Sequence, residues 1–357
     1  MKAKVTFPKE SDFFHKELCQ EVQCYFETNA FSKYGNTGLV AKYILIKTLF
    51  LIAYFLVFFV HQSYLVFLLF GILGVLGIIL AINVAHDAIH GIAHSKSWVN
   101  SYFKIQLDLI GANSYTWQKR HQFGHHTFPN THGKDPDLTQ TKIVKILPKA
   151  THKSYHKFQY IYVPFLYAFY TINWIYIRDF TDFFAKNSFL KKIPKKEYVK
   201  LTVFKMVYIS VFIVLPILFT SFTITQVLFG HFILHIAASY FLTLALVPSH
   251  VSEHAVFVTP NNDGKMPYSW SHHQLITTTD FATNCQLTTW LLGGFNHHVA
   301  HHLFPKVSHI HYPNITPIIQ QLAKKYNVPY HQENSVFQAY QSHFNLLKNN
   351  GEQATTI

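Results

Sequence analysis

Two long stretches without a charged side chain constrain the fold of this chain most strongly. Residues 48–85 and residues 206–252 contain no Asp, Glu, Lys or Arg. Each stretch can form two helices of roughly 20 residues, the length needed to cross the hydrocarbon core of a bilayer. The sequence therefore predicts two transmembrane hairpins, with spans at about 44–62 and 65–85, and at about 203–221 and 224–248.

The composition supports a membrane protein over the alternative, a soluble core built from unusually apolar helices. Hydrophobic residues make up 49% of the chain and charged residues only 13%, whereas soluble domains carry about 25% charged residues. Residues 98–112 are too short and too polar to span, so we expect an interfacial or re-entrant helix there. The aromatic segment 160–177 is predicted to lie at the membrane interface rather than to form a fifth span.

The distribution of positive charge predicts the orientation. The net charge is +13, and the turns near 61–64 and 220–224 carry no Lys or Arg. The positive-inside rule then places both termini and all histidine clusters in the cytoplasm, in a multi-pass protein of a bacterial inner membrane. We expect the basic residues to contact anionic lipid headgroups, and no nucleic-acid motif is visible. The lysines before the second hairpin are Lys191, Lys192, Lys195, Lys196 and Lys200.

Three parts are predicted along the chain: a cytoplasmic lead-in at 1–40, a main domain at 41–325 and a cytoplasmic C-terminal tail at 326–357. The polar N-terminus predicts no cleavable signal peptide, and the 3 cysteines form no CxxC pair, so reduced thiols are expected. An amphipathic helix in the lead-in would lie on the membrane surface or on the cytoplasmic body. Its apolar positions are Phe14, Leu18, Val22 and Phe26.

Three histidine clusters carry the strongest functional signal. They are HDAIH at 86–90, HQFGHH at 121–126 and HHVAHH at 297–302. Each contains a pair separated by four residues, and on a helix that spacing places both imidazoles on one face. With the adjacent His126 and His301, eight candidate nitrogen ligands are present. Because this exceeds the needs of one ion, the pattern predicts a two-metal site.

The ligand type and its position narrow the chemistry. Neutral imidazole suits iron, zinc, copper and nickel, and the lack of nearby cysteine argues against iron–sulfur or structural zinc sites. His86 follows the second apolar run directly. The predicted site therefore lies at the end of the helical bundle, where a substrate with a long apolar tail could reach it from the membrane.

The three clusters resemble the histidine boxes of the membrane fatty-acid desaturases, which take the forms HxxxH, HxxxHH and (H/Q)xxHH. Local matches in the segments 273–282, 290–294 and 301–305 extend the resemblance, which covers roughly residues 40–325. Within the family, the sequence most resembles bacterial acyl-CoA or acyl-lipid desaturases of the linoleoyl-CoA, front-end-like type. It implies an all-α integral membrane protein with four transmembrane helices in two hairpins and a cytoplasmic helical cap that carries a di-metal site.

The resemblance also implies two iron ions held mostly by histidines. Carried over residue by residue, the ligands are His86, His90, His121, His125, His126, His298, His301 and His302. The family takes a further ligand from the cytoplasmic end of the fourth span, where His250 lies, with His254 and His273 as rivals. Asn284 is a weaker candidate for a metal-bound water, and Asp87 and Glu253 could orient imidazole N–H groups.

Some histidines stand outside this assignment. His298 occupies a position where many front-end desaturases have Gln, which weakens any inference about the carbon attacked. His231 and His235 lie within the fourth span, too far from His250 to share its site. They are expected to be neutral and hydrogen-bonded, or to line the closed end of an acyl tunnel. A surface role, or a role supporting the ligands, is expected for His94, His132, His297, His309 and His311.

The implied reaction is oxygen-dependent. Electrons from outside would activate O2 at the di-iron centre, two hydrogens would leave adjacent methylenes of an acyl-CoA or acyl-lipid chain, and a cis double bond and water would result. No fused haem motif or flavin fingerprint is present, so a separate ferredoxin or small cytochrome with its reductase is expected. The alternatives are a di-iron membrane hydroxylase and a non-enzymatic histidine-rich metal transporter, which would need ligands near the bilayer midplane.

Overall fold

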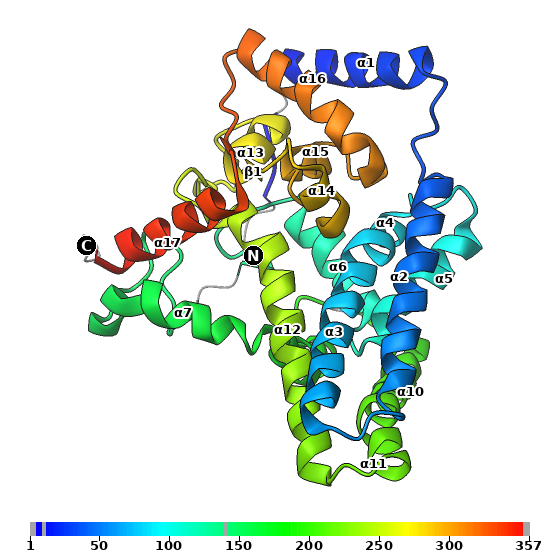
Figure 1. The fold of residues 1–357 in the computed structure, drawn as a ribbon. Coiled ribbons are helices and arrows are strands. Elements are labelled where there is room, and N and C mark those ends of the chain that lie inside the picture. Colours follow the sequence, from blue (N-terminus) through cyan, green and yellow to red (C-terminus); the bar gives the residue numbers. More distant parts are fainter. Residues whose placement is uncertain (1–4, 9–11, 139–140, 187, 191, 353–357) are drawn as a thin grey trace. The chain divides into compact units, whose positions relative to one another are not determined.

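The computed structural model describes residues 5–8, 12–138, 141–186, 188–190 and 192–352, and it is mostly helical (Figure 1). It divides into two compact units. The first unit comprises Met1–Tyr34, Arg120–Val163 and Ala245–Ile357, and the second comprises Gly35–Lys119 and Pro164–Leu244.

Within the described ranges, four helices are long and apolar enough to cross a membrane, as predicted. Their bounds are Thr37–Leu56 (α2), Ser63–His90 (α3, Ser63–Leu80; η1, Ala81–Ala85; α4, His86–His90), Lys195–Phe219 (α10, Lys195–Ile209; η5, Ser210–Val214; α11, Leu215–Phe219) and Ile224–His250 (α12). The first begins and ends earlier than the predicted 44–62: Asn36 caps its start by accepting from the Leu39 N–H at 3.1 Å. The two lysines that it thereby includes have polar partners, since Lys42 donates to Asn83 and Lys47 Nζ lies 3.0 Å from Gln106 Oε1.

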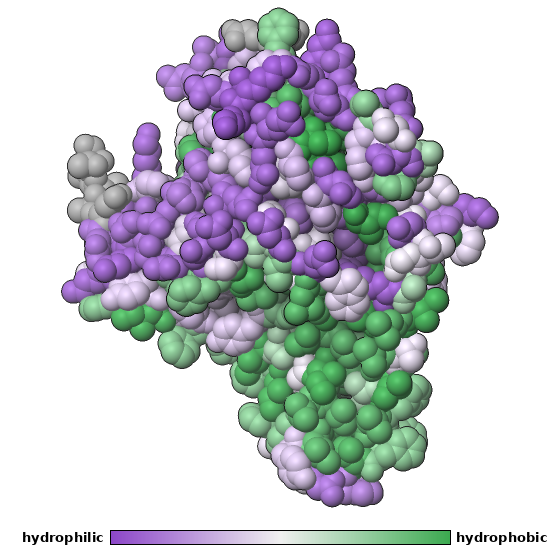
Figure 2. All heavy atoms as spheres, turned by 45° about the horizontal axis from the view of Figure 1, so that its top comes forward, coloured by the Kyte–Doolittle hydropathy of each residue, from purple (hydrophilic) through white to green (hydrophobic). Residues whose placement is uncertain are grey.

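Within the second unit the spans pack closely and turn apolar side chains outward. A Cβ atom on Gly74 of α3 would lie 2.2 Å from the Leu234 carbonyl oxygen on α12, so only glycine allows this approach. Large apolar side chains such as Ile44, Phe55 and Leu68 are exposed, and Figure 2 shows hydrophobic residues gathered over the spans. Exposed apolar surface of this extent is typical of helices solvated by lipid.

The remaining helices of the second unit are short. They are α5 (Ser97–Leu109), α6 (Ser114–Arg120), α8 (Tyr170–Asn173), η4 (Trp174–Arg178) and α9 (Asp179–Phe184), with α6 ending at the first residue of the other unit. Buried Asp108 on α5 lies 2.7 Å from Lys200 Nζ, which ties this helix to α10. In the described part of segment 160–177, where α7 (Gln159–Tyr167) contains Pro164, no fifth candidate span is found.

The first unit is built around helices and one two-stranded parallel sheet. Its elements are α1 (Phe13–Thr28), η2 (His121–His125), η3 (Ser154–Phe158), α13 (Trp270–Thr277), β1 (Asp280–Phe281), α14 (Gln286–Leu292), α15 (His298–Leu303), η6 (His309–His311), α16 (Tyr312–Lys325), β2 (Gln332–Glu333) and α17 (Val336–Glu352). The segment expected to be a C-terminal tail thus contains β2 and α17, and residues 353–357 lie outside the described part.

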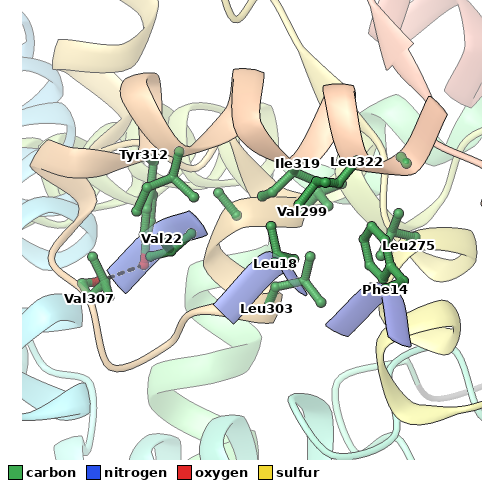
Figure 3. Close-up of a cluster of buried hydrophobic side chains, with 13 residues drawn as sticks. Phe14, Leu18, Val22, Leu275, Val299, Leu303, Val307, Tyr312, Ile319 and Leu322 are labelled. Carbon is green, nitrogen blue, oxygen red and sulfur yellow. Dashed lines mark hydrogen bonds between the residues drawn. The ribbon is translucent and has the colours of Figure 1, made fainter. Parts of the chain in front are cut away.

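The amphipathic helix predicted near the N-terminus forms as α1, and its apolar stripe packs within the first unit rather than facing outward. Phe14, Leu18 and Val22 share a buried cluster with residues of α15 and α16, including Ile319 and Leu322 (Figure 3). The helix was expected either on the membrane surface or on the body of the protein. These contacts support the second location. The cluster also supports α15, which carries the third histidine cluster.

Candidate metal centre

Four histidines from three elements converge within the first unit. His125 ends η2, His250 ends α12, and His298 and His302 lie one turn apart on α15. Each offers one ring nitrogen, and these four atoms lie within 4.8 Å of one another. All four side chains are buried. The fold thus joins ligands that are more than a hundred residues apart in the sequence into one group, here called the four-histidine site.

Side chains outside the cluster hold two of these imidazoles by Nδ1. His125 Nδ1 lies 3.0 Å from Asp135 Oδ2, and His302 Nδ1 lies 2.9 Å from Gln274 Oε1. Carboxylate and amide oxygens accept hydrogen bonds, so the Nδ1 atom of each ring is the donor. In a neutral imidazole the proton on Nδ1 leaves Nε2 with a free lone pair, which is the form that binds a metal ion.

Backbone carbonyls hold the other two imidazoles in the same way. His250 Nδ1 lies 3.1 Å from the carbonyl oxygen of Thr277, and His298 Nδ1 lies 3.2 Å from that of Phe295. A carbonyl oxygen can only accept, so these Nδ1 atoms also carry the proton. All four rings are therefore fixed in the tautomer that turns an unprotonated Nε2 into the cluster.

The Nε2 atoms that face one another carry no proton to share. His125 Nε2 lies 3.0 Å from His250 Nε2, which lies 2.7 Å from His298 Nε2. His302 Nε2 is buried and has no hydrogen-bond partner within the described ranges. Lone pairs converging at such distances repel each other unless a cation lies among them. The donor set therefore fits a transition-metal ion that prefers imidazole.

Burial keeps the histidines outside the spans in the neutral form. It lowers the pKa of His121 to about 3, and it holds the pKa values of His298 and His302 well below 6.5. Protonation would compete with metal binding, since both use the same lone pair. At neutral pH these rings are therefore available as ligands without loss of a proton.

Asp135 and Gln274 are functional candidates that sequence analysis does not identify. Asp135 is buried and also accepts hydrogen bonds from the backbone N–H groups of Asn130 and Asp137, at 3.0 and 2.9 Å. Burial raises the pKa of Asp135, but contact with His125 outweighs it and holds that pKa below its usual value. A carboxylate behind a ligating imidazole raises ligand basicity and fixes its orientation.

A second group of histidines lies beside the first, still within the first unit. His126, His301 and His302 each offer a nitrogen atom within 4.8 Å of the others. Residues 121–125 form a π-helical turn, in which the His126 N–H bonds the His121 carbonyl oxygen at 2.9 Å. The wider turn brings His121 Nε2 to 3.1 Å from His126 Nε2. The four-residue spacing predicted an α-helical face here, whereas the π turn aligns residues five apart.

The first histidine cluster belongs to the second unit. His86 and His90 are buried on α4, and their ring centroids are 4.8 Å apart. The π-helical turn η1 comes directly before them. Single π turns within α-helices occur often at functional sites, and here one precedes the first cluster while another contains most of the second. The helical pairing predicted for His86 and His90 is present.

Of the three candidates for a ligand near the end of the fourth span, His250 alone belongs to the four-histidine site. His254 is 46% exposed and its Nε2 atom lies 3.3 Å from Glu333 Oε1. His273 is buried, but its Nε2 atom lies 2.9 Å from the Pro129 carbonyl oxygen, and burial lowers its pKa to about 4.

The residues expected to support the ligands lie in different surroundings. Asp87 is buried, and its Oδ1 atom lies 3.9 Å from His86 Nδ1, beyond hydrogen-bond length. Glu253 is exposed and accepts a hydrogen bond from Asn345 at 2.9 Å. Asn284 is also exposed. Neither Glu253 nor Asn284 bonds an imidazole of the four-histidine site.

His231 and His235 form a hydrogen-bonded network inside the second unit. His235 Nε2 lies 3.1 Å from the Tyr208 hydroxyl, His235 Nδ1 lies 2.9 Å from Thr171 Oγ1, and His231 Nε2 lies 2.8 Å from the Tyr176 hydroxyl. His235 and Tyr208 also line a small cavity of about 30 Å³ with mostly apolar walls. The pair is hydrogen-bonded, in line with one of the two expectations, and His235 alone of the two borders the cavity.

Comparison with known proteins identifies the family. Residues 61–334 match the family model described as fatty acid desaturase. The sn-1 linoleoyl-lipid 6-desaturase of Arthrospira platensis is 31% identical over 350 residues, which cover 97% of this chain and 94% of that protein. The protein of the same name from Synechocystis is 30% identical, with 89% of each chain covered. The acyl-lipid (8-3)-desaturase of Physcomitrium patens is 29% identical, with 96% and 72% covered.

Four apolar spans and buried clusters of neutral imidazoles define a membrane protein with a candidate metal centre. The chain belongs to the fatty acid desaturase family. It is an oxidoreductase that desaturates fatty acyl chains, and so an enzyme of lipid metabolism. This agrees with the family and the activity expected from the three histidine boxes, and it favours desaturation over the hydroxylase and transporter alternatives.

Proposed function

We propose that the protein is an O2-dependent di-iron desaturase that forms a cis double bond in a lipid-bound acyl chain. The observation that carries this proposal is the convergence of four unprotonated Nε2 atoms in a buried site. His125, His250, His298 and His302 would hold one iron ion. The proposed ligands of the second ion are His121, His126 and His301, completed by His86 and His90 of the first cluster.

The proposed reaction balances with an external two-electron donor. An acyl –CH2–CH2– unit, O2, two electrons and two protons give –CH=CH– and two water molecules. Bound iron would supply the oxygen activation that removal of hydrogen from an unactivated methylene requires. The residues of the chain hold each imidazole of the four-histidine site in one tautomer, keep it neutral by burial, and exclude bulk water from the site.

The substrate is proposed to be an unsaturated acyl chain carried on a membrane lipid rather than on coenzyme A. The names of the similar proteins from Arthrospira platensis and Synechocystis specify a linoleoyl-lipid, and that from Physcomitrium patens specifies an acyl-lipid. A lipid-bound chain is also available to a protein with four spans without leaving the membrane. A purified-lipid assay and an acyl-CoA assay, run side by side, distinguish the two carriers.

The electrons are proposed to come from a ferredoxin or a small cytochrome with its reductase. The chain has a net charge of +13, and acidic electron carriers are attracted to basic surfaces. Both termini and the three histidine boxes are proposed to face the cytoplasm of a bacterial cell. Stopped-flow reduction by an acidic ferredoxin should slow as ionic strength rises; a rate independent of salt would remove the electrostatic part of this proposal.

Expression in a host that lacks polyunsaturated lipids, grown with linoleic acid, tests the proposed reaction, because the similar proteins are named for a linoleoyl-lipid. Mass spectrometry should find a new double bond in lipid-bound acyl chains, and a hydroxylated chain instead would favour the hydroxylase. His302→Ala should abolish product and lower bound iron. His254→Ala is the matched control, because His254 is exposed and lies outside the four-histidine site. Full activity in His302→Ala would refute the ligand assignment.

A further inference from the structure

The short helix that carries the third histidine cluster lacks a cap of its own. α15 has only six residues, His298–Leu303, and His297 at its N-cap makes no side-chain capping bond. The first N–H groups of a helix have no partner within it, and a helix this short is unstable without tertiary contacts. The orientation of His298 and His302 must therefore be fixed from outside α15.

Asp280 of β1 supplies the missing acceptor. Its side chain is completely buried, and its Oδ1 atom accepts a hydrogen bond from the Val299 N–H at 2.7 Å. A carboxylate at a helix N-terminus satisfies the unpaired N–H groups and interacts favourably with the helix dipole. Here that carboxylate comes from a strand nearly twenty residues earlier, and it bonds the residue directly after His298.

Tyr330 holds the other oxygen of Asp280. The Tyr330 hydroxyl donates to Asp280 Oδ2 at 2.6 Å, and Gln320 Nε2 on α16 donates to the same hydroxyl at 3.2 Å. The backbone of Asp280 is fixed as well, since its N–H bonds the His331 carbonyl oxygen at 3.0 Å. Both oxygens of Asp280 are thus hydrogen-bonded, one to the first turn of α15 and one to Tyr330, so the group gives α15 a rigid anchor.

The same stretch of chain reaches the other ligands of the four-histidine site. Gln274 bonds His302, and the Thr277 carbonyl accepts from His250. The Thr279 N–H bonds the Ser249 carbonyl oxygen, next to His250, at 2.8 Å. Residues 274–280 thus contact α15 and the end of α12 within seven positions, which couples the placement of His250 to that of α15.

We propose that Asp280 and Tyr330 form a positioning pair for the four-histidine site. The pair holds the first turn of α15 so that His298 and His302 keep Nε2 directed toward His125 and His250. Asp280 touches neither substrate nor reacting atoms, and it acts through α15. This inference rests on the proposed function, because the quantity it predicts is the affinity of the site for iron.

Three variants of the full-length protein test the pair. Asp280→Ala leaves buried N–H and O–H groups without their acceptor. Removal of a residue that supports a metal ligand typically lowers metal affinity 10–100-fold. Asp280→Asn keeps an oxygen for the Val299 N–H and should retain most of the affinity, and Tyr330→Phe should fall between the two. Asp263→Asn is the control, because Asp263 is exposed in the same unit.

The measurements are iron retained against a ferrous chelator, the Mössbauer spectrum of the bound iron, KM and kcat with lipid substrate, and the thermal midpoint of the metal-free protein. We expect Asp280→Ala to lose iron affinity and kcat with KM little changed, and Asp280→Asn to rescue both. Unchanged iron affinity and spectrum in Asp280→Ala and Tyr330→Phe, with only the thermal midpoint lowered, would overturn the pair. If Asp280→Ala does not fold, the iron affinities of Asp280→Asn and Tyr330→Phe test the positioning pair. Absence of iron in the wild-type protein would instead overturn the proposed function, and the pair with it.

Discussion

At the scale of single residues, each ligand of the four-histidine site depends on the atom behind it. Asp135, Gln274, Thr277 and Phe295 each accept a hydrogen bond from one Nδ1 atom, and this selects the tautomer with Nε2 unprotonated. The same four contacts fix the orientation of the rings. Metal affinity is therefore expected to respond to residues that never touch the metal.

Asp135→Asn tests this dependence. The amide is less basic than the carboxylate and removes one of two acceptor oxygens that His125 and the backbone N–H groups share. We expect a 10–100-fold loss in iron affinity or activity, measured by chelator competition and product formation. The control is Asp263→Asn, because Asp263 is exposed in the same unit. Equal effects of the two substitutions would contradict the role of Asp135.

Buried His343 is expected to cause part of the loss of folding stability at acid pH. His343 Nδ1 donates to the Val251 carbonyl oxygen at 2.6 Å, and burial lowers its pKa from 6.5 to about 4. Because the folded pKa lies below the unfolded one, stability is complete above pH 6.5 and falls as the pH drops toward 4. The loss from this group reaches about 3 kcal/mol. His343→Gln should flatten the fall in thermal midpoint between pH 7 and pH 4; parallel curves would contradict the assignment.

At the scale of elements, the packing of α3 on α12 requires glycine at position 74. A Cβ atom on Gly74 would lie 2.2 Å from the Leu234 carbonyl oxygen, whereas one on Gly71 would meet Ile233 at 3.6 Å, an ordinary contact. Gly74→Ala should therefore destabilise the protein by about 1–3 kcal/mol. Gly71→Ala should be neutral or stabilise by about 0.5–1 kcal/mol, since alanine favours a helix. Thermal midpoints in detergent measure both, and equal shifts would contradict this packing.

The elements differ in how far the sequence predicts them. The four spans follow from the charge-free stretches, and the three boxes follow from histidine spacing and the family resemblance. The packing of α1 on α16 does not, because an amphipathic pattern identifies an apolar face but not its partner. The π turn at 121–125 does not follow from the sequence either, since four-residue spacing predicts an α-helical face and the π turn aligns residues five apart. The roles of Asp135 and Gln274 cannot be predicted from the sequence, because their hydrogen bonds to His125 and His302 form only in the folded chain.

At the scale of the whole molecule, the proposed sidedness can be read from thiols already present. Cys19, Cys24 and Cys285 are exposed, and the positive-inside rule places all three in the cytoplasm. A membrane-impermeant maleimide should label them in inverted vesicles and not in spheroplasts. In a variant without native cysteines, His61→Cys, in the turn between α2 and α3, should show the opposite pattern. Labelling of Cys285 in spheroplasts would refute the topology.

Iron stoichiometry tests the central claim most directly, that buried histidines form a two-iron centre. The wild-type protein, purified anaerobically with ferrous iron, is expected to retain about two iron ions per chain by elemental analysis. His125→Ala and His302→Ala should retain fewer, while His254→Ala should match the wild type. A wild-type protein with one iron ion or none, or two ions retained in both His125→Ala and His302→Ala, would contradict the account.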